Sequence, residues 1–309
     1  MTRLLRILLP VLAAVLAFAA AIRQPVLRGL PYTAADRSDP RALRAHVETL
    51  TRVPHSADDA EGLRVSAGYI ERHFRAATPR VELQDFHARR REYRNVIARF
   101  GPEAGPLLVV GAHYDAFGPL PGADDNASGT AGLLEFARLL GRNPPKTPVV
   151  LVAYANEEPP FFGSEQMGSA VHARSIEKEN VAGMISLEMI GYYSEKQTWP
   201  NLTFKLLYPH RGDFIGVGGG WRDRHLARHV KRGIKGAGGI DVYSFTGPRQ
   251  TLDASDHRNY WAHGWPAVIV TDTAYLRNPN YHTRHDTADT LDYTKMARVV
   301  DGVFNAVRN

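Results

Sequence analysis

Acidic and histidine side chains gather in four clusters of this 309-residue chain, and each cluster follows a run of apolar residues. The clusters are His113-Tyr114-Asp115 with the loop GADDNASG (122–129), the pair Glu157-Glu158, the single Glu188, and the run YHTRHDT (281–287). One such cluster alone is most simply a solvated surface feature. Carboxylates brought together away from water cost free energy unless cations neutralise them. Four clusters that meet at one place would therefore indicate a metal site.

The types of side chain in these clusters suit zinc. The chain has no cysteine, so a metal would be held by histidines and carboxylates. Such ligand sets, with positions left open, are typical of catalytic rather than structural zinc sites. Two neighbouring metals need one ligand that bridges them, and Asp125, between a loop and a helix, is a natural bridge. A further acid beside the metals is then required as general base.

The apolar runs before the clusters predict the elements that position them. Continuous apolar segments are typical of strands buried on both faces, and four of them are Leu107–Ala112, Thr147–Ala155, Ala182–Met189 and Ala267–Asp272. Helical patterns lie between them, including Gly129–Leu140 and Ser164–Ile176. This alternation predicts an α/β fold, a three-layer α/β/α sandwich with a mostly parallel central sheet. Ligands bind at the carboxyl ends of the strands in such sheets, where the four clusters fall.

In combination, the motifs resemble those of the co-catalytic two-zinc exopeptidase family. That family includes secreted bacterial leucine aminopeptidases, glutamate carboxypeptidase and, as a divergent branch, glutaminyl cyclase. The resemblance rests on HYD (113–115), GADDNASG, Glu157-Glu158 and the HTxxDT pattern (282–287), in that order and spacing. It covers roughly residues 38–309, which we expect to form a single zinc peptidase domain of the zinc aminopeptidase type.

The resemblance implies two zinc ions per chain and a role for each matching residue. His113 would bind one zinc and Asp125 would bridge both. Glu158 would bind one zinc, Glu188 the other, and His282 would complete the second site. Many members of the family have Asp at the position of Glu188, so the carboxylate is kept here on a side chain that is one methylene longer.

Further residues would act beside the metals. Glu157 would be the general base, and Asp115 would orient His113, as acids that hold a ligand imidazole commonly do. Asp286 and the run Ser255-Asp256-His257 match recurrent family positions outside the set of metal ligands. The donor to the oxyanion stays open between Tyr281 and His257.

These observations predict a zinc-dependent metallopeptidase acting on peptide substrates, with an aminopeptidase as the leading interpretation. A carboxypeptidase would need a cation for the substrate carboxylate, which Arg277 or Arg258 could supply. A glutaminyl cyclase is expected to have a weakened second metal position. A non-catalytic binding module should have lost Glu157 or a ligand. Neither kind of loss is found in this sequence.

The N-terminus predicts export. Arg3 and Arg6 precede sixteen uncharged, mostly apolar residues, Ile7–Ile22, and the stretch Ala19-Ala20-Ala21 near the end of this run offers small residues for cleavage. This pattern suits a secretory signal, whereas a full membrane span needs about 20 residues. An uncleaved membrane anchor is the alternative, so residues 1–25 are excluded from the fold. We expect a periplasmic or extracellular protein, in contact with a membrane only through this segment.

Two other patterns are given no functional role. The net charge of +6 is modest, and the basic run Arg222–Lys235 predicts a solvated helix face rather than a nucleic-acid site, since no aromatic platform or known motif accompanies it. The GVGGG run (216–220) does not complete a dinucleotide fingerprint. It lies in the least regular stretch of the chain, Tyr193–Ser255, and we expect it to be a loop.

Overall fold

The computed structural model describes residues 3–309, with side chains described from residue 8 onward, so the side chains of Arg3 and Arg6 lie outside the described part. Its centre is an eight-stranded sheet in the order β1-β2-β4-β3-β5-β8-β6-β7. In chain order the strands are β1 (Val81–Ala88), β2 (Arg91–Phe100), β3 (Leu107–His113), β4 (Val149–Tyr154), β5 (Val181–Leu187), β6 (Phe214–Gly220), β7 (Asp241–Gly247) and β8 (Ala267–Thr271).

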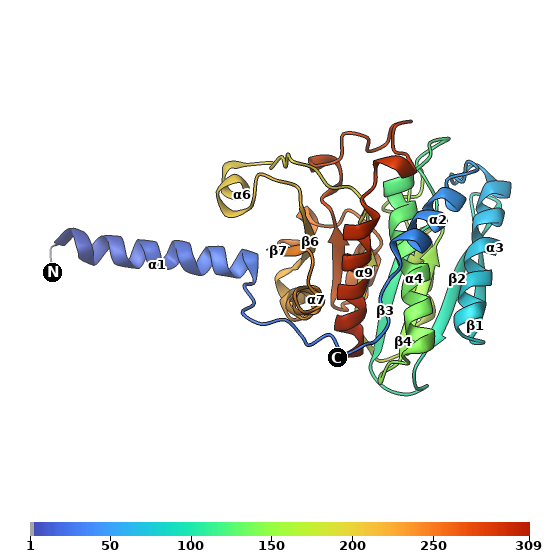
Figure 1. Ribbon diagram of the computed structural model, residues 1–309, viewed down its shortest axis with the longest axis horizontal. Coiled ribbons are helices and arrows are strands. Elements are labelled where there is room, and N and C mark those ends of the chain that lie inside the picture. The colour runs from blue at the N-terminus through green and yellow to red at the C-terminus, as the bar shows by residue number, and fades with distance from the viewer. Residues whose placement is uncertain (1–2) are drawn as a thin grey trace.

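Helices cover both faces of this sheet. In chain order the helices of the described residues are α1 (Arg3–Arg23), α2 (Pro40–Leu50), α3 (Ala60–Ala77), α4 (Gly129–Arg142), α5 (Gly168–Ser175), α6 (Leu202–Leu207), α7 (Arg224–Ala237), α8 (His257–Ala262) and α9 (Tyr293–Arg308). Figure 1 shows α2, α3, α4, α7 and α9 over one face, while α5 and α8 pack against the other. The expected three-layer α/β/α sandwich is confirmed.

The central strands account for the expected parallel character of the sheet. β4, β3, β5 and β8 lie side by side and run parallel, so their carboxyl ends meet at one edge. Antiparallel pairing occurs on both flanks, where β2 meets β4 and where β6 meets β8. The sheet is therefore mixed, with its parallel part at the position predicted for the site.

Alternation along each strand divides the core between the two faces. In β4, Val149, Leu151 and Ala153 pack into the cluster under α4 and α9. Val150, Val152 and Tyr154 point the other way, into the cluster under α5 and α8. Because successive side chains of a strand point to opposite faces, a continuous apolar run is what a strand covered on both sides requires. The apolar runs of the sequence are thereby explained.

Acidic residues fix where three of the helices begin. The Asp39 carboxylate accepts a hydrogen bond from the backbone N–H of Arg41 at the start of α2. Asp59 and Asp292 cap α3 and α9 in the same manner. Each cap satisfies a backbone N–H that the helix itself leaves unpaired.

The expectation that GVGGG forms a loop is wrong, because these residues belong to β6, which is buried along its whole length. Glycine is depleted in strands, so composition argues against this assignment. The structure supplies the reason for the glycines, which is close packing. A Cβ on Gly216 would lie 2.5 Å from the Phe245 ring, and one on Gly218 would lie 2.8 Å from Ile269.

The apolar N-terminal segment forms α1, which extends away from the body of the protein in Figure 1. Its last turn is part of the fold, since Ile22 is buried with Trp199, Tyr208 and Phe214. Earlier side chains, from Leu8 to Phe18, are largely exposed. Within the described residues, no helix has both the length and the apolar character needed to cross a membrane.

The packing of β6 generates a prediction about stability. Gly216→Ala should lower the free energy of unfolding by about 1–3 kcal/mol, the usual cost of forcing atoms into a filled core. Gly247→Ala is the matched control in the neighbouring strand β7, where the nearest atom to a new Cβ is 3.7 Å away. Urea unfolding of the two variants checks this. Equal stability would show that the glycines of β6 are not required by packing.

Candidate metal centre

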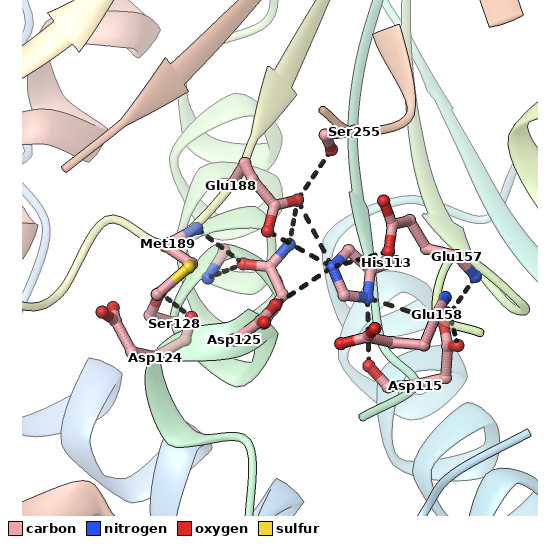
Figure 2. A network of polar contacts seen from close by, with 12 residues as sticks. His113, Asp115, Asp124, Asp125, Ser128, Glu157, Glu158, Glu188, Met189 and Ser255 are labelled. Carbon is pink, nitrogen blue, oxygen red and sulfur yellow. Dashed lines mark hydrogen bonds and ion pairs between the residues drawn. The ribbon is translucent and has the colours of Figure 1, made fainter. Parts of the chain in front are cut away.

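The four clusters meet at one edge of the sheet. β3 ends at His113, the chain leaving β4 carries Glu157 and Glu158, and Glu188 directly follows β5. Asp125 comes from the irregular turn Ala123–Ser128 that precedes α4. Figure 2 shows His113, Asp125, Glu188, Glu157 and Glu158 gathered from these separate segments. The parallel register of the central strands is what brings residues so distant in sequence together.

Two groups of potential metal ligands share Asp125. In the first, His113 Nε2 lies 3.5 Å from Asp125 Oδ1 and 3.3 Å from Glu188 Oε2. In the second, His282 Nε2 lies 2.9 Å from Asp125 Oδ2 and 3.2 Å from Glu158 Oε1. Within each group the ligand atoms lie within 4.8 Å of one another, so each group could hold one metal ion. The two oxygens of Asp125 face different groups, as a bridging carboxylate requires.

The hydrogen bonding of the second group fits a cation. His282 Nε2 and Glu158 Oε1 are buried, and neither has a hydrogen-bond partner among the described residues. His282 Nε2 is close to Asp125 Oδ2 but is not aligned with it as a hydrogen bond would be. Buried polar atoms are nearly always paired. A metal ion between these atoms would satisfy both.

Electrostatics lead to the same conclusion. Burial raises the pKa of Glu158 to about 8, with a further contribution from the Asp125 charge. Burial also raises the pKa of Glu157 and of Glu188. The pKa of Asp125 is lowered, because the favourable interaction with the nearby His113 and His282 imidazoles outweighs its burial. A cluster of buried carboxylates is costly on its own, and divalent cations would offset that cost.

Asp115 holds three members of the centre in place. Its two carboxylate oxygens each accept a backbone hydrogen bond of 3.0 Å, one from Glu157 and one from Glu158. Its backbone carbonyl accepts a 3.0 Å hydrogen bond from His113 Nδ1. The proton of His113 is thereby placed on Nδ1, and Nε2 is free to face the metal site.

Asp286 and Ser255 support the two acidic ligands of the first group. The Asp286 carboxylate accepts hydrogen bonds from the backbone N–H groups of Asp124 and Asp125, at 2.9 and 3.1 Å. Ser255 Oγ donates to Glu188 Oε2 at 2.7 Å. The Asn126 side-chain amide also donates to that oxygen, at 3.3 Å, and its Oδ1 accepts a hydrogen bond from the backbone N–H of Met189.

His282 lies between two aromatic rings. Tyr281 stacks on one side, with ring centroids 3.8 Å apart, and Phe117 stacks on the other at 4.1 Å. The sequence gives no signal for the role of Phe117, which comes from the loop after β3. The two stacking contacts restrict rotation of the His282 imidazole. Phe117 therefore helps to position a potential metal ligand, a role that the sequence did not predict.

Backbone strain is concentrated around the centre. Asn156, Met189 and His282 have positive φ angles of 62°, 50° and 54°. His282 is itself a potential ligand, Met189 directly follows Glu188, and Asn156 directly precedes Glu157 beside the centre. Such conformations are uncommon for residues other than glycine and recur at functional sites, where surrounding contacts enforce them.

The remaining candidates occupy distinct positions. Asp256 is fully buried, and neither carboxylate oxygen has a hydrogen-bond partner among the described residues. Burial raises its pKa to about 7. His257 is also buried, with Nε2 2.7 Å from the Leu252 carbonyl oxygen, and burial lowers its pKa to about 4. In the part of the chain that the structure describes, no hydrogen bond joins His257 to the ligand groups.

Comparison with known proteins identifies the family. Residues 95–307 match the model of peptidase family M28. The uncharacterized protein YfbL of Escherichia coli is 48% identical over 301 residues, which cover 93% of both chains.

Two solved structures share the fold. One is BSAP, a zinc aminopeptidase from Bacillus subtilis (TM-score 0.71, 15% identity, 91% of this chain and 96% of that one). The other is a glutaminyl cyclase from Bacteroides thetaiotaomicron (TM-score 0.66, 20% identity, 89% and 99%). The family match spans more than half of the sequence and includes the described ligand groups. The chain therefore belongs to peptidase family M28, a family of zinc peptidases.

Proposed function

We propose that this protein is an aminopeptidase that removes the N-terminal residue of peptides at a centre of two zinc ions. His113 and Glu188 would hold one zinc ion, and Glu158 and His282 would hold the other. Asp125 would bind both ions. The support is the sharing of Asp125 between two ligand groups and the unpaired buried atoms of the second. When bound, the zinc ions would polarise the scissile carbonyl and make water acidic enough to give hydroxide near neutral pH.

Glu157 suits the role of general base. Its Oε2 lies 3.8 Å from His113 Nε2, beside the centre, yet it belongs to neither ligand group. The Asp115 carboxylate fixes its backbone, so its side chain has a defined place from which to act. It would accept a proton from the attacking water and return it to the leaving amine, which is the usual task of such an acid.

The observation that carries the choice of aminopeptidase is the charge around the site. Five acidic side chains surround it: Asp115, Asp125, Glu157, Glu158 and Glu188. With two divalent zinc ions bound, these five carboxylates would still leave one negative charge in excess of the four positive ones, which favours a substrate ammonium group over a substrate carboxylate. The first residue of a peptide thus fits this site better than the last.

The two arginines that a carboxypeptidase could use are engaged elsewhere. Arg277 is buried and donates to Gln197 Oε1 and to the Phe214 carbonyl oxygen, both at 2.8 Å. Arg258 lies over the Phe162 ring and 3.5 Å from Asp253 Oδ2. Neither is held ready for a substrate carboxylate. The cyclase and binding-module alternatives are disfavoured because all five ligand candidates and Glu157 are present.

Tyr281 is the better candidate for the oxyanion donor. Its ring stacks on His282, which places it beside the centre. Burial and the nearby carboxylates raise its pKa, so it keeps the proton it would donate. His257 donates a hydrogen bond from its Nε2–H to the Leu252 carbonyl oxygen. Because its pKa is lowered, the imidazole is neutral and Nδ1 carries no proton to donate.

The substrate end is tested with peptides that differ in one terminal group. Acetylation of the N-terminal amine should abolish cleavage, because the peptide then has no ammonium group to interact with the carboxylates of the site. Amidation of the C-terminus should leave cleavage nearly unchanged. Release of the N-terminal amino acid from matched peptides measures both. Cleavage of the acetylated peptide that depends on a free C-terminus would establish a carboxypeptidase instead.

The roles of the adjacent glutamates are tested by Glu157→Gln and Glu158→Gln. Glu157→Gln should retain two zinc ions per chain but lose turnover by a factor of about 10²–10⁴, the usual worth of a general base. Glu158→Gln should lose zinc as well as activity, because a neutral amide is a poor zinc ligand. Each variant serves as the control for the other, with zinc content and turnover measured on the same samples. Loss of zinc in Glu157→Gln with retention in Glu158→Gln would reverse the assignment.

A further inference from the structure

The solvent-facing side of α7 carries a stripe of four exposed basic residues, Arg224, Arg228, Arg232 and Lys235. Their spacing of three and four residues puts them on the same side of the helix. Among the described residues, none of the four forms a salt bridge within 4.0 Å. Unneutralised cations in a row repel one another, so this basic stripe is suited to an anionic partner.

The segment that joins α1 to the rest of the chain lies along this stripe. The backbone N–H of Leu30 donates to the Arg232 carbonyl oxygen at 2.9 Å, and Lys235 Nζ donates to the Val26 carbonyl oxygen at 2.9 Å. Leu27 projects from the same segment and is 94% exposed. An open hollow of about 740 Å³ is lined by Leu27 and Arg28 together with Arg228 and Arg232. An isolated apolar side chain is thus held among cations.

The base of α1 is anchored in the domain. Ile22 is buried in an aromatic cluster, and the Arg23 guanidinium lies over the rings of Tyr208 and Tyr243, at 5.8 and 5.6 Å. Lys231 Nζ donates to the Arg23 carbonyl oxygen at 2.8 Å. A second cavity, of about 920 Å³, opens at this junction and is lined by five cations and two acids: Arg23, Arg211, Lys231, Lys235, Lys295, Asp213 and Asp241. The junction therefore continues the positive charge of the stripe.

Apolar side chains extend outward from this basic region. Leu16 on α1 is 60% exposed, and the other large apolar residues from Leu8 to Phe18 are exposed to a similar degree. On α6, Leu206 is 77% exposed, while Phe204 of this helix and Tyr208 directly after it pack on Phe245 of β7. In Figure 1, α1, α6 and α7 all lie at the β7 end of the sheet. Exposed apolar area of this extent is unfavourable in water and indicates an apolar partner.

We propose that the β7 end of the protein docks on a membrane surface rich in anionic phospholipids. α1 enters the acyl layer from the surface, and Leu27 and Leu206 reach the boundary between headgroups and acyl chains. The basic stripe faces the lipid phosphates. Apolar insertion combined with a neighbouring basic face is the general pattern of interfacial membrane binding.

The charge distribution favours a bilayer over other partners. Two copies paired in parallel through α1 would bring two basic stripes close together, which Coulomb repulsion disfavours. An antiparallel pair would leave the stripes without an anionic partner. A nucleic acid would satisfy the cations but not the apolar helix. A bilayer with anionic headgroups satisfies both. The proposal requires that α1 is retained in the mature protein, and it does not depend on the catalytic activity.

Because the chain has no cysteine, a single introduced cysteine can be labelled at a chosen position. Leu27→Cys and Leu206→Cys are made separately in the full chain, labelled with an environment-sensitive fluorophore, and transferred from detergent to vesicles. The control is Val65→Cys on α3, a position that is 45% exposed at the opposite end of the sheet. The vesicles contain phosphatidylcholine alone or with phosphatidylglycerol. The emission of the Leu27 and Leu206 probes should shift to the blue on the anionic vesicles, and that of the Val65 probe should not.

The contribution of the stripe is measured with Arg228→Gln/Arg232→Gln in the labelled Leu27→Cys chain. Each cation is worth about fivefold in binding to an anionic surface. The amount of anionic lipid that gives half of the shift should therefore rise roughly 25-fold. The control is Arg52→Gln/Arg72→Gln, which removes the same charge from the α2–α3 side, where both residues are exposed. It should leave the amount of anionic lipid that gives half of the shift nearly unchanged.

Three results would overturn the proposal. The protein could float with the vesicles while the Leu27 and Leu206 probes stay in water, which would show that α1 binds lipid alone. The stripe variant could behave like its control, which would show that the cations do not contribute. The protein could stay off both vesicles and form a dimer, which would show that a second copy covers α1.

Discussion

The shared position of Asp125 between His113 and His282 is the constraint on which the centre depends. One carboxylate has to present an oxygen to each of two ligand groups, at 3.5 and 2.9 Å from the two imidazoles. That is possible only if its backbone cannot move, and the Asp286 carboxylate holds the N–H groups of Asp124 and Asp125. The geometry of both groups is thus set by a residue that belongs to neither.

The fold serves this constraint through its parallel strands. β4, β3 and β5 deliver Glu157-Glu158, His113 and Glu188 to one edge, and no loop has to span a long distance to do so. The strained backbones of Asn156, Met189 and His282 are then fixed by the rigid sheet beneath them. Local strain of this kind costs about 1–3 kcal/mol per residue, and a well-packed core can sustain it. Stability in the core and geometry at the site are therefore linked.

The sequence predicted the site well because acids and histidines that follow apolar runs have few roles other than metal binding or catalysis. Buried acids and histidines after apolar runs predicted the edge of the sheet, and the structure brings His113, Asp125, Glu158, Glu188 and His282 together there. The sequence did not predict features that depend on contacts between residues far apart in the chain. The glycines of β6 are explained by the ring of Phe245, and the position of Phe117 against His282 depends on how a loop folds back. Neither contact leaves a local pattern, because both join residues far apart in the chain.

We propose that Asp125 joins two metal sites, and anomalous X-ray diffraction at the zinc absorption edge tests this arrangement most directly. Crystals of the protein prepared with zinc should show two anomalous peaks about 3.5–4 Å apart, one on each side of the Asp125 carboxylate. One peak should contact His113 and Glu188, and the other Glu158 and His282. A single peak, or peaks that do not contact Asp125, would contradict the account.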